Sequence, residues 1–119
     1  MSLQNGTSNA EQLQAMITST TVTVYPAMVP FNVVLLPPAH FHQASGGNVF
    51  IHEAPETKAL GDAFTASGMP CTLHSDMRGV LYSKLVLNLN NSVNAISGKP
   101  LRTELMTYVK FMKAKQMTH

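Results

Sequence analysis

The chain has 119 residues, a formal net charge of +2 and a single cysteine, Cys71. This length allows one modest domain or parts of two, and the charge is too mild for a strongly basic nucleic-acid-binding protein. One cysteine excludes an internal disulfide and is typical of a reducing compartment. We therefore expect a cytoplasmic protein without a nucleic-acid partner.

Residues 12–52 contain no Asp, Glu, Lys or Arg, which raises the question of a membrane segment. The most apolar part, residues 21–36, is interrupted by Pro26 and Pro30 and is shorter than the roughly 20 residues of a spanning helix. The alternation in residues 21–24 favours a strand with one packed face. Buried sheet, and no membrane span, is the prediction for this region.

The first half of the chain predicts mixed helix and strand. A strand ends within residues 1–4, and Asn5-Gly6 forms a turn. Ser8 and Glu11 have the spacing of a capping box, which predicts a helix through about Ile17. Turn residues then separate four predicted strands, at residues 21–25, 31–36, 39–44 and 48–52.

The second half becomes helical. Pro55 suits the first turn of a helix that ends at Gly68, and a last strand covers residues 71–74. A long helix begins at Ser75 or Asp76 and ends at Gly98. A final amphipathic helix begins near Thr103, with four residues on its apolar side: Leu105, Tyr108, Val109 and Met112. We predict α/β followed by α, with a boundary that divides the chain into residues 1–75 and 76–119.

Lys84 is the only charged residue in the stretch from Gly79 to Gly98. Burial of an ammonium group disfavours its charged form, so Lys84 either extends along an apolar surface to water or acts as an acid in a cleft. Residues four apart share a helix face, which aligns Lys84 with Asn88 and Ser92, while Asn91 lies on a neighbouring line. This arrangement suits a small anionic ligand with a carbonyl group, and equally a buried hydrogen-bond network.

Four segments resemble one known family in their order and spacing. Residues 82–88 read YSKLVLN, and residues 94–98 read NAISG. Residues 2–6 read SLQNG, and residues 38–42 read PAHFH, followed by two glycines and a strand-like run. Together they resemble the ketopantoate reductase (2-dehydropantoate 2-reductase) family over residues 1 to about 105, although Tyr82 stands where that family more often has tryptophan.

The resemblance implies the end of a Rossmann-type sheet domain (residues 1–75) joined to the first helices of a helical substrate and dimerisation domain (residues 76–119). It implies reduction of ketopantoate with NADPH as cofactor, in an enzyme that forms a homodimer at full length. Lys84 would be the general acid, and Asn88 with Ser92 or Asn91 would bind the substrate. Asn5 would contact the cofactor or substrate from the sheet domain.

The sequence also departs from that family. It contains no G-x-G-x-x-G turn for a dinucleotide pyrophosphate, and the later helices, one of which supplies a carboxylate partner for the lysine, are missing. We therefore expect an internal fragment that is inactive alone. Two alternatives remain open: a reductase of another small 2-oxo acid, and a non-catalytic fragment or interaction module with an exposed sheet edge.

Three other groups suggest simpler roles. His40, His42 and His52 do not have a spacing that fixes three metal ligands, so edge-strand histidines and no metal are expected. Cys71 is expected to be a packed apolar residue rather than a nucleophile. Glu104 is expected to interact with a helix dipole rather than to act as a base.

Overall fold

The computed structural model describes residues 1–98, 103 and 106. Within these residues it is a small α/β protein with a three-stranded mixed sheet, a two-stranded sheet and three helices, the last of them long. By compactness the chain divides into one unit of Met1–Leu85 and a second of Val86–His119. This division falls within the last helix, so the predicted split at residue 75 remains a prediction about domains.

The three-stranded sheet contains β1 (Ala27–Met28), β4 (Val49–His52) and β5 (Cys71–His74), in the order β1-β4-β5. Strand β1 is antiparallel to β4, whereas β4 and β5 are parallel. Ser2 forms a parallel bridge to Pro26, in which the N–H of Ser2 donates to the Tyr25 carbonyl at 2.9 Å. Of the strand predicted within residues 1–4, the structure therefore has one bridge residue, Ser2, beside β1.

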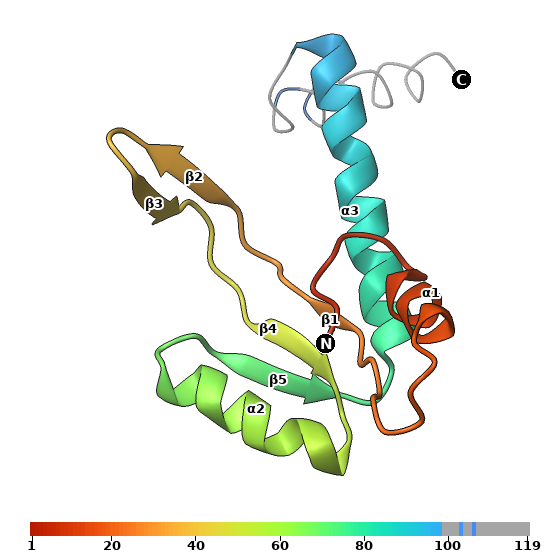
Figure 1. Cartoon of the computed structure of the whole chain (residues 1–119). Helices are drawn as coiled ribbons and strands as arrows, with labels where there is room; N and C mark the ends of the chain where they lie inside the picture. Colours follow the sequence, from red (N-terminus) through yellow and green to blue (C-terminus); the bar gives the residue numbers. More distant parts are fainter. Residues whose placement is uncertain (99–102, 104–105, 107–119) are drawn as a thin grey trace, which may run out of the picture. The chain divides into compact units, whose positions relative to one another are not determined.

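Helix α2 (Pro55–Ala66) joins β4 to β5 and packs against both, which gives a β–α–β unit (Figure 1). Val49 and Ile51 alternate with half-buried residues along β4 and are 1% and 0% exposed. With Ala27 they form the core, and four partly buried residues surround them: Phe31, Phe64, Cys71 and Leu73. Gly61 allows the close approach of α2, since a Cβ there would lie 3.1 Å from Leu73 Cδ2.

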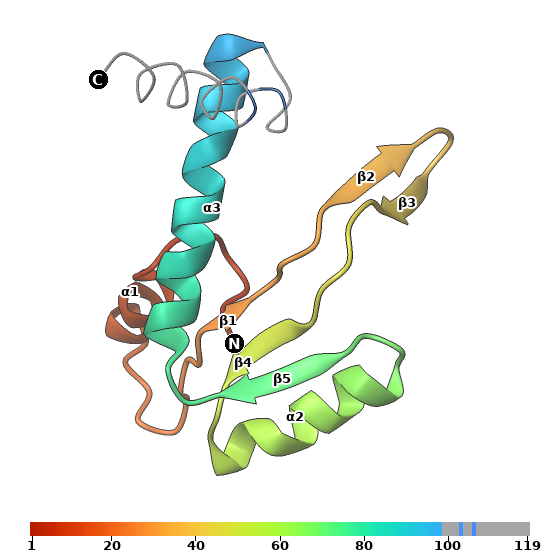
Figure 2. The ribbon, with the colours of Figure 1, turned by 180° about the vertical axis from the view of Figure 1, so that it is seen from behind.

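Strands β2 (Val33–Leu36) and β3 (His40–Gln43) form an antiparallel hairpin of their own. A cis peptide bond joins Pro37 to Pro38 at its tip. Seen from both sides, the hairpin extends beyond β4, β5 and α2 (Figures 1 and 2). All eight strand residues are exposed, so the prediction of strands here is confirmed but the prediction of burial is wrong. Nothing in the described part of the chain packs over the hairpin.

Helix α3 (Met77–Ser97) has the predicted limits. The N–H of Gly79 donates to Asp76 Oδ1 at 2.8 Å, and Gly98 has φ +63° directly after the last turn. Asp76 therefore caps the helix, and Gly98 takes the left-handed conformation that ends it. None of the helices in the described ranges has the length and apolarity to cross a membrane.

Two local predictions are wrong. Ser8 does not cap α1 (Asn9–Met16) with its side chain; its Oγ accepts from Gln12 Nε2 at 2.9 Å, because Ser8 lacks the extended backbone of a capping residue. Residues 21–25 are not a strand either. Gln14 binds the N–H of Val24 (2.7 Å) and the carbonyl of Val22 (3.1 Å), and so occupies backbone groups that a ladder would use.

The predicted apolar side of the final helix, with Leu105, Tyr108, Val109 and Met112, lies outside the described residues, as does Glu104. The assignment of the sheet to a Rossmann-type domain also remains a prediction. The described residues form a mixed α/β arrangement followed by a long helix.

Candidate functional site

Lys84 lies in the third turn of α3, at the end of the first unit, and its side chain is half-buried. Leu81, one turn earlier, is also half-buried, while Tyr82 and Leu85 are 47% and 39% exposed. The cap at Asp76 fixes where α3 begins. The position of Lys84 on an apolar helix is therefore set by local structure that the sequence predicts.

The predicted substrate-binding residues follow in the part of α3 that belongs to the second unit. Asn88 is half-buried, whereas Asn91 and Ser92 are both exposed. Helical geometry places Asn88 one turn after Lys84 and Ser92 one turn further, on the same face. Exposure therefore does not distinguish Asn91 from Ser92 as the second substrate-binding residue.

Asn5 lies in the bend that follows the sheet pairing of Ser2, and its side chain is exposed. The backbone oxygen of Asn5 accepts a hydrogen bond of 2.6 Å from Asn9 Nδ2 in the first turn of α1. Gly6 has φ +121°, a conformation that residues with a Cβ rarely adopt. The predicted turn is confirmed, and α1 holds it in place through Asn9.

A small hollow links this turn to α3. It has a volume of about 10 Å³, and its lining includes Gln4, Gly6 and Asn9 from the turn region and Leu81 from α3. Leu81 is three residues before Lys84, but neither Lys84 nor Asn5 lines this hollow. Ser2 also lines the hollow; it is 6% exposed, and its Oγ has no hydrogen-bond partner among the described residues.

A second hollow, of about 980 Å³, has a volume in the range of small-molecule sites. Its lining comes from α1, the segment before β1, His52 and the first turns of α3, and includes neither Lys84 nor Asn5. It combines charges of both signs, Glu11 and Asp76 with Arg78. Neither hollow is lined by Lys84 or Asn5, so we place the candidate site at Lys84 on the chemistry of this residue and of the amides that follow it in the sequence, and not on volume.

Sequence reasoning missed Arg78 and Gln14 in this larger hollow. The guanidinium of Arg78 lies 5.7 Å from the centre of the Tyr82 ring. Gln14 holds the segment around Val24 against α1. The four-residue spacing of Arg78 and Tyr82 was a usable signal. Nothing in the sequence indicates that Gln14 bonds a segment ten residues away.

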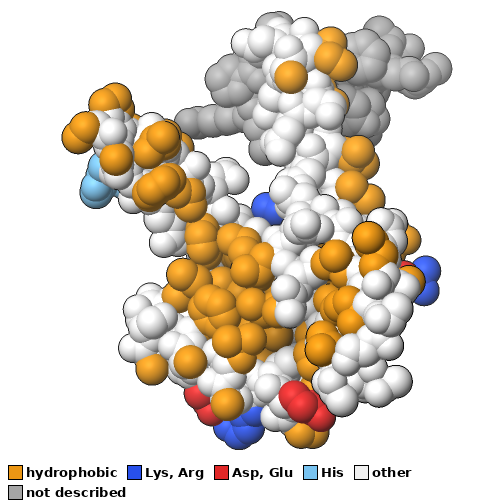
Figure 3. All heavy atoms as spheres, viewed as in Figure 1, with side chains coloured by type: hydrophobic (Ala, Val, Ile, Leu, Met, Phe, Trp, Pro, Cys, Tyr) orange, Lys and Arg blue, Asp and Glu red, His pale blue; other side chains and the backbone are white. Residues whose placement is uncertain are grey.

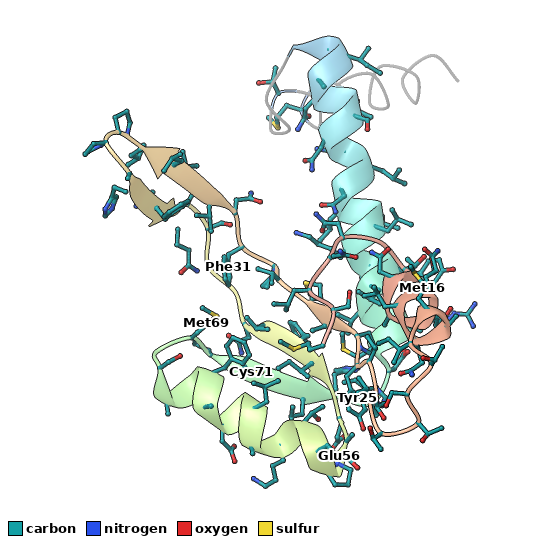
Figure 4. All side chains as sticks on the ribbon, viewed as in Figure 1. Met16, Tyr25, Phe31, Glu56, Met69 and Cys71 are labelled. Carbon is teal, nitrogen blue, oxygen red and sulfur yellow. The ribbon has the colours of Figure 1, made fainter. Side chains whose placement is uncertain are left out.

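The histidines of the described part of the chain lie on β3, β4 and β5. Among the described residues no three of His, Cys, Asp or Glu are grouped to hold a metal ion. His40 and His42 lie on exposed β3, while His52 on β4 stacks on Tyr25 with ring centroids 5.8 Å apart. The Tyr25 hydroxyl donates to Glu56 Oε2 at 3.0 Å (Figure 4), and this bond to a carboxylate raises the pKa of Tyr25.

Cys71 lies at the start of β5 beside the core, and burial raises the pKa of its thiol. A raised pKa lowers the fraction of thiolate, the nucleophilic form. The packing of Cys71 against the core agrees with the prediction of an apolar role (Figure 4).

Comparisons of the chain with protein-family models, with curated proteins and with solved structures give no match. The functional assignment therefore depends on the chemistry of the residues and on how they lie. Those residues comprise Lys84, the only charged residue from Gly79 to Gly98, the amides that follow it in the sequence, and an asparagine turn in the first unit. Such a set can bind an anion, polarise a carbonyl oxygen and donate a proton to it.

Proposed function

We propose that this chain carries the substrate-side residues of an NADPH-dependent reductase of a branched 2-oxo acid, with ketopantoate as the substrate. The observation that supports this best is the shared hollow. Gln4 and Gly6, the neighbours of Asn5, line it together with Leu81, one turn before half-buried Lys84, although Asn5 and Lys84 themselves do not line it. A reductase of this kind needs both motifs at one reaction centre.

In this proposal Lys84 binds the keto oxygen of the substrate and protonates it. NADPH, when bound, supplies the hydride that reduces the keto carbon. The ammonium group of Lys84 donates a hydrogen bond to the keto oxygen, and its charge stabilises the negative charge that develops there. It then gives a proton to the alkoxide as general acid.

The amides hold the rest of the substrate. Asn88, with Ser92 or Asn91, hydrogen-bonds the hydroxyl and carboxylate oxygens, so the keto carbon is held beside Lys84. Asn5 contacts the substrate or the nicotinamide from the sheet side. Residues 1–75 would then end a Rossmann-type domain, and residues 76–119 would begin the helical domain of a cytoplasmic homodimer.

The described residues do not fit the pyrophosphate of a dinucleotide. The sequence has no G-x-G-x-x-G turn, the carboxylate of Asp76 already caps α3, and α2 begins with Pro55, which has no N–H. NADPH would have to be bound by residues outside this sequence. We therefore expect the 119-residue chain to be inactive on its own.

The test uses the protein encoded when the reading frame is extended through its flanking coding sequence. We expect ketopantoate-dependent oxidation of NADPH, and Lys84→Ala should lower kcat by about 10²–10⁴-fold because the general acid is lost. Lys58→Ala is the matched control, since Lys58 is exposed on α2 and pairs with Asp62 on the same helix at 3.2 Å. Near-normal turnover of Lys84→Ala would overturn the proposal. Equal kcat/KM for ketopantoate and pyruvate would favour another 2-oxo acid.

A second candidate is an interaction module without catalysis, and the exposed hairpin favours it. Val33, Leu35 and Phe41 are 52%, 62% and 73% exposed, and neither strand carries a charge. Figure 3 shows apolar side chains along this hairpin and over the neighbouring sheet. Natural edge strands are protected by charges, so this module would self-associate. Sedimentation of the chain and of Leu35→Lys tests it, since a monomer at all concentrations contradicts the module.

A further inference from the structure

The Asn5–Gly6 peptide has an arrangement that the proposed function does not explain. Asn5 is the only asparagine in the sequence that precedes a glycine. The Asn5 side chain is exposed, and Gly6 has no side chain to shield its own nitrogen from that amide. The N–H of Gly6 makes no hydrogen bond within the described part of the chain. No side chain at position 6 therefore stands between this nitrogen and the side-chain amide of Asn5.

Asn9 acts on the same peptide group. Its Nδ2 donates to the backbone oxygen of Asn5 at 2.6 Å. The oxygen of Asn5 and the nitrogen of Gly6 belong to one resonant peptide. When that nitrogen loses its proton, the negative charge spreads onto the oxygen, where a donor is already in place to stabilise it.

We propose that Asn5 is a self-modification site, at which the chain converts the side-chain amide to a carboxylate with the assistance of Asn9. The deprotonated nitrogen of Gly6 attacks Cγ of Asn5, a C–N bond forms, and ammonia leaves to give a cyclic imide. Water then adds to either imide carbonyl and breaks its bond to nitrogen. The products are aspartate or isoaspartate at position 5 and one ammonia, with water as the only co-reactant.

The proposed reaction requires glycine at position 6 for two reasons. A Cβ at position 6 would lie 2.8 Å from Asn9 Nδ2, so a side chain there would displace the assisting amide. The φ of +121° is also strained for any residue with a Cβ. Asn9 offers the internal comparison, because it precedes Ala10 within α1, where the helix restrains the backbone.

The modification adds one negative charge beside the small hollow that reaches Leu81. Its consequence for binding, unlike the modification itself, rests on the proposed function. A carboxylate at position 5 repels an anionic 2-oxo acid, whereas the amide donates a hydrogen bond to it. Modified protein should therefore bind ketopantoate more weakly than unmodified protein.

The experiment follows the full chain by mass spectrometry during incubation at mildly alkaline pH. Cleavage after Glu11 releases one peptide that contains both Asn5 and Asn9, and fragmentation assigns the conversion to one of them. We expect conversion at Asn5, faster at higher pH, and no comparable conversion at Asn9.

Two variants test the assistance. Asn9→Ala removes the donor, and Asn9→Asp is the close isostere whose carboxylate oxygens cannot donate. Each should slow conversion at Asn5 by about tenfold, the effect of one lost hydrogen bond. In concentrated urea, where the bond is absent, wild type and Asn9→Ala should react at equal rates. Equal rates in the native state, or a native Asn5 slower than the unfolded one, would overturn the proposal.

The mass readout is independent of any ligand. If Asn5 converts but ketopantoate binding to the product of the extended reading frame is unchanged, the modification stands and the proposed role of Asn5 fails. If Asn5 does not convert while Lys84→Ala abolishes turnover, the modification fails and the reductase stands.

Discussion

Two strand pairs of equal length behave in opposite ways in this molecule. In the β4–β5 pair, Val49 and Ile51 are 1% and 0% exposed, whereas in the β2–β3 pair Leu35 and Phe41 are 62% and 73% exposed. Neither pair contains Asp, Glu, Lys or Arg. The difference is that α2 packs on β4 and β5. Apolar strands are therefore buried here by a neighbour along the chain, and not by their own pattern.

The comparison predicts the largest effect at Ile51. Truncation by Ile51→Ala leaves a cavity in the three-residue core and should lower the free energy of unfolding by about 2–5 kcal/mol, which urea titration would measure. Ile51→Val should cost only about 0.5–1.5 kcal/mol. A cost below 1 kcal/mol for Ile51→Ala would mean that β4 is not the centre of the fold.

The second largest effect on the free energy of unfolding is expected at Thr57, where β4 connects to α2. Thr57 is 3% exposed, its Oγ1 donates to the His52 carbonyl at 2.7 Å, and it accepts from the N–H of Ala54 at 3.0 Å. Thr57→Val keeps the shape and leaves these partners without a bond, so about 1–3 kcal/mol should be lost. Thr57→Ser keeps the hydroxyl and is the control. Equal losses for the two variants would contradict a role for the hydrogen bonds.

A smaller effect depends on pH. Burial raises the pKa of the Cys71 thiol, so the folded state holds this proton more tightly than the unfolded state does. The resulting stabilisation is complete below the ordinary thiol pKa of about 8.5 and is lost as pH rises through the raised value. The free energy of unfolding should fall more steeply above that pH in wild type than in Cys71→Ala. Parallel curves would show that Cys71 is not protected by the core.

The hairpin should respond least. Leu35→Ser removes an exposed apolar side chain and should change the free energy of unfolding by no more than about 0.5 kcal/mol in dilute protein. The same urea titration measures it. A loss above 2 kcal/mol would show that the hairpin is covered in solution. The contrast in exposure between the two strand pairs would then hold only for the isolated chain.

Local signals were sufficient for much of the fold. Asp76 and Gly98 marked α3 correctly, and Pro55 and Gly68 marked α2 almost to the residue, because capping and positive-φ positions are encoded by the residues that occupy them. The strand at residues 71–74 was also predicted exactly. Lys84 could be singled out for the same reason, since it is the only charged residue from Gly79 to Gly98 in the sequence.

Tertiary structure decided the rest. Residues 21–25 alternate between polar and apolar side chains, as in a strand. Gln14, ten residues before Val24, instead hydrogen-bonds the N–H of Val24 and the carbonyl of Val22. The apolar sequence of the β2–β3 hairpin predicts buried sheet, but no described element packs over this hairpin. The meeting of the Gln4–Gly6 turn with Leu81, and the bond from Asn9 to the Asn5 oxygen, depend on how the first residues lie against α1 and α3. The sequence by itself determined where α2, α3 and β5 begin and end, because the signals for these elements are local. Which faces are covered, and which motifs meet, depended on contacts between distant segments.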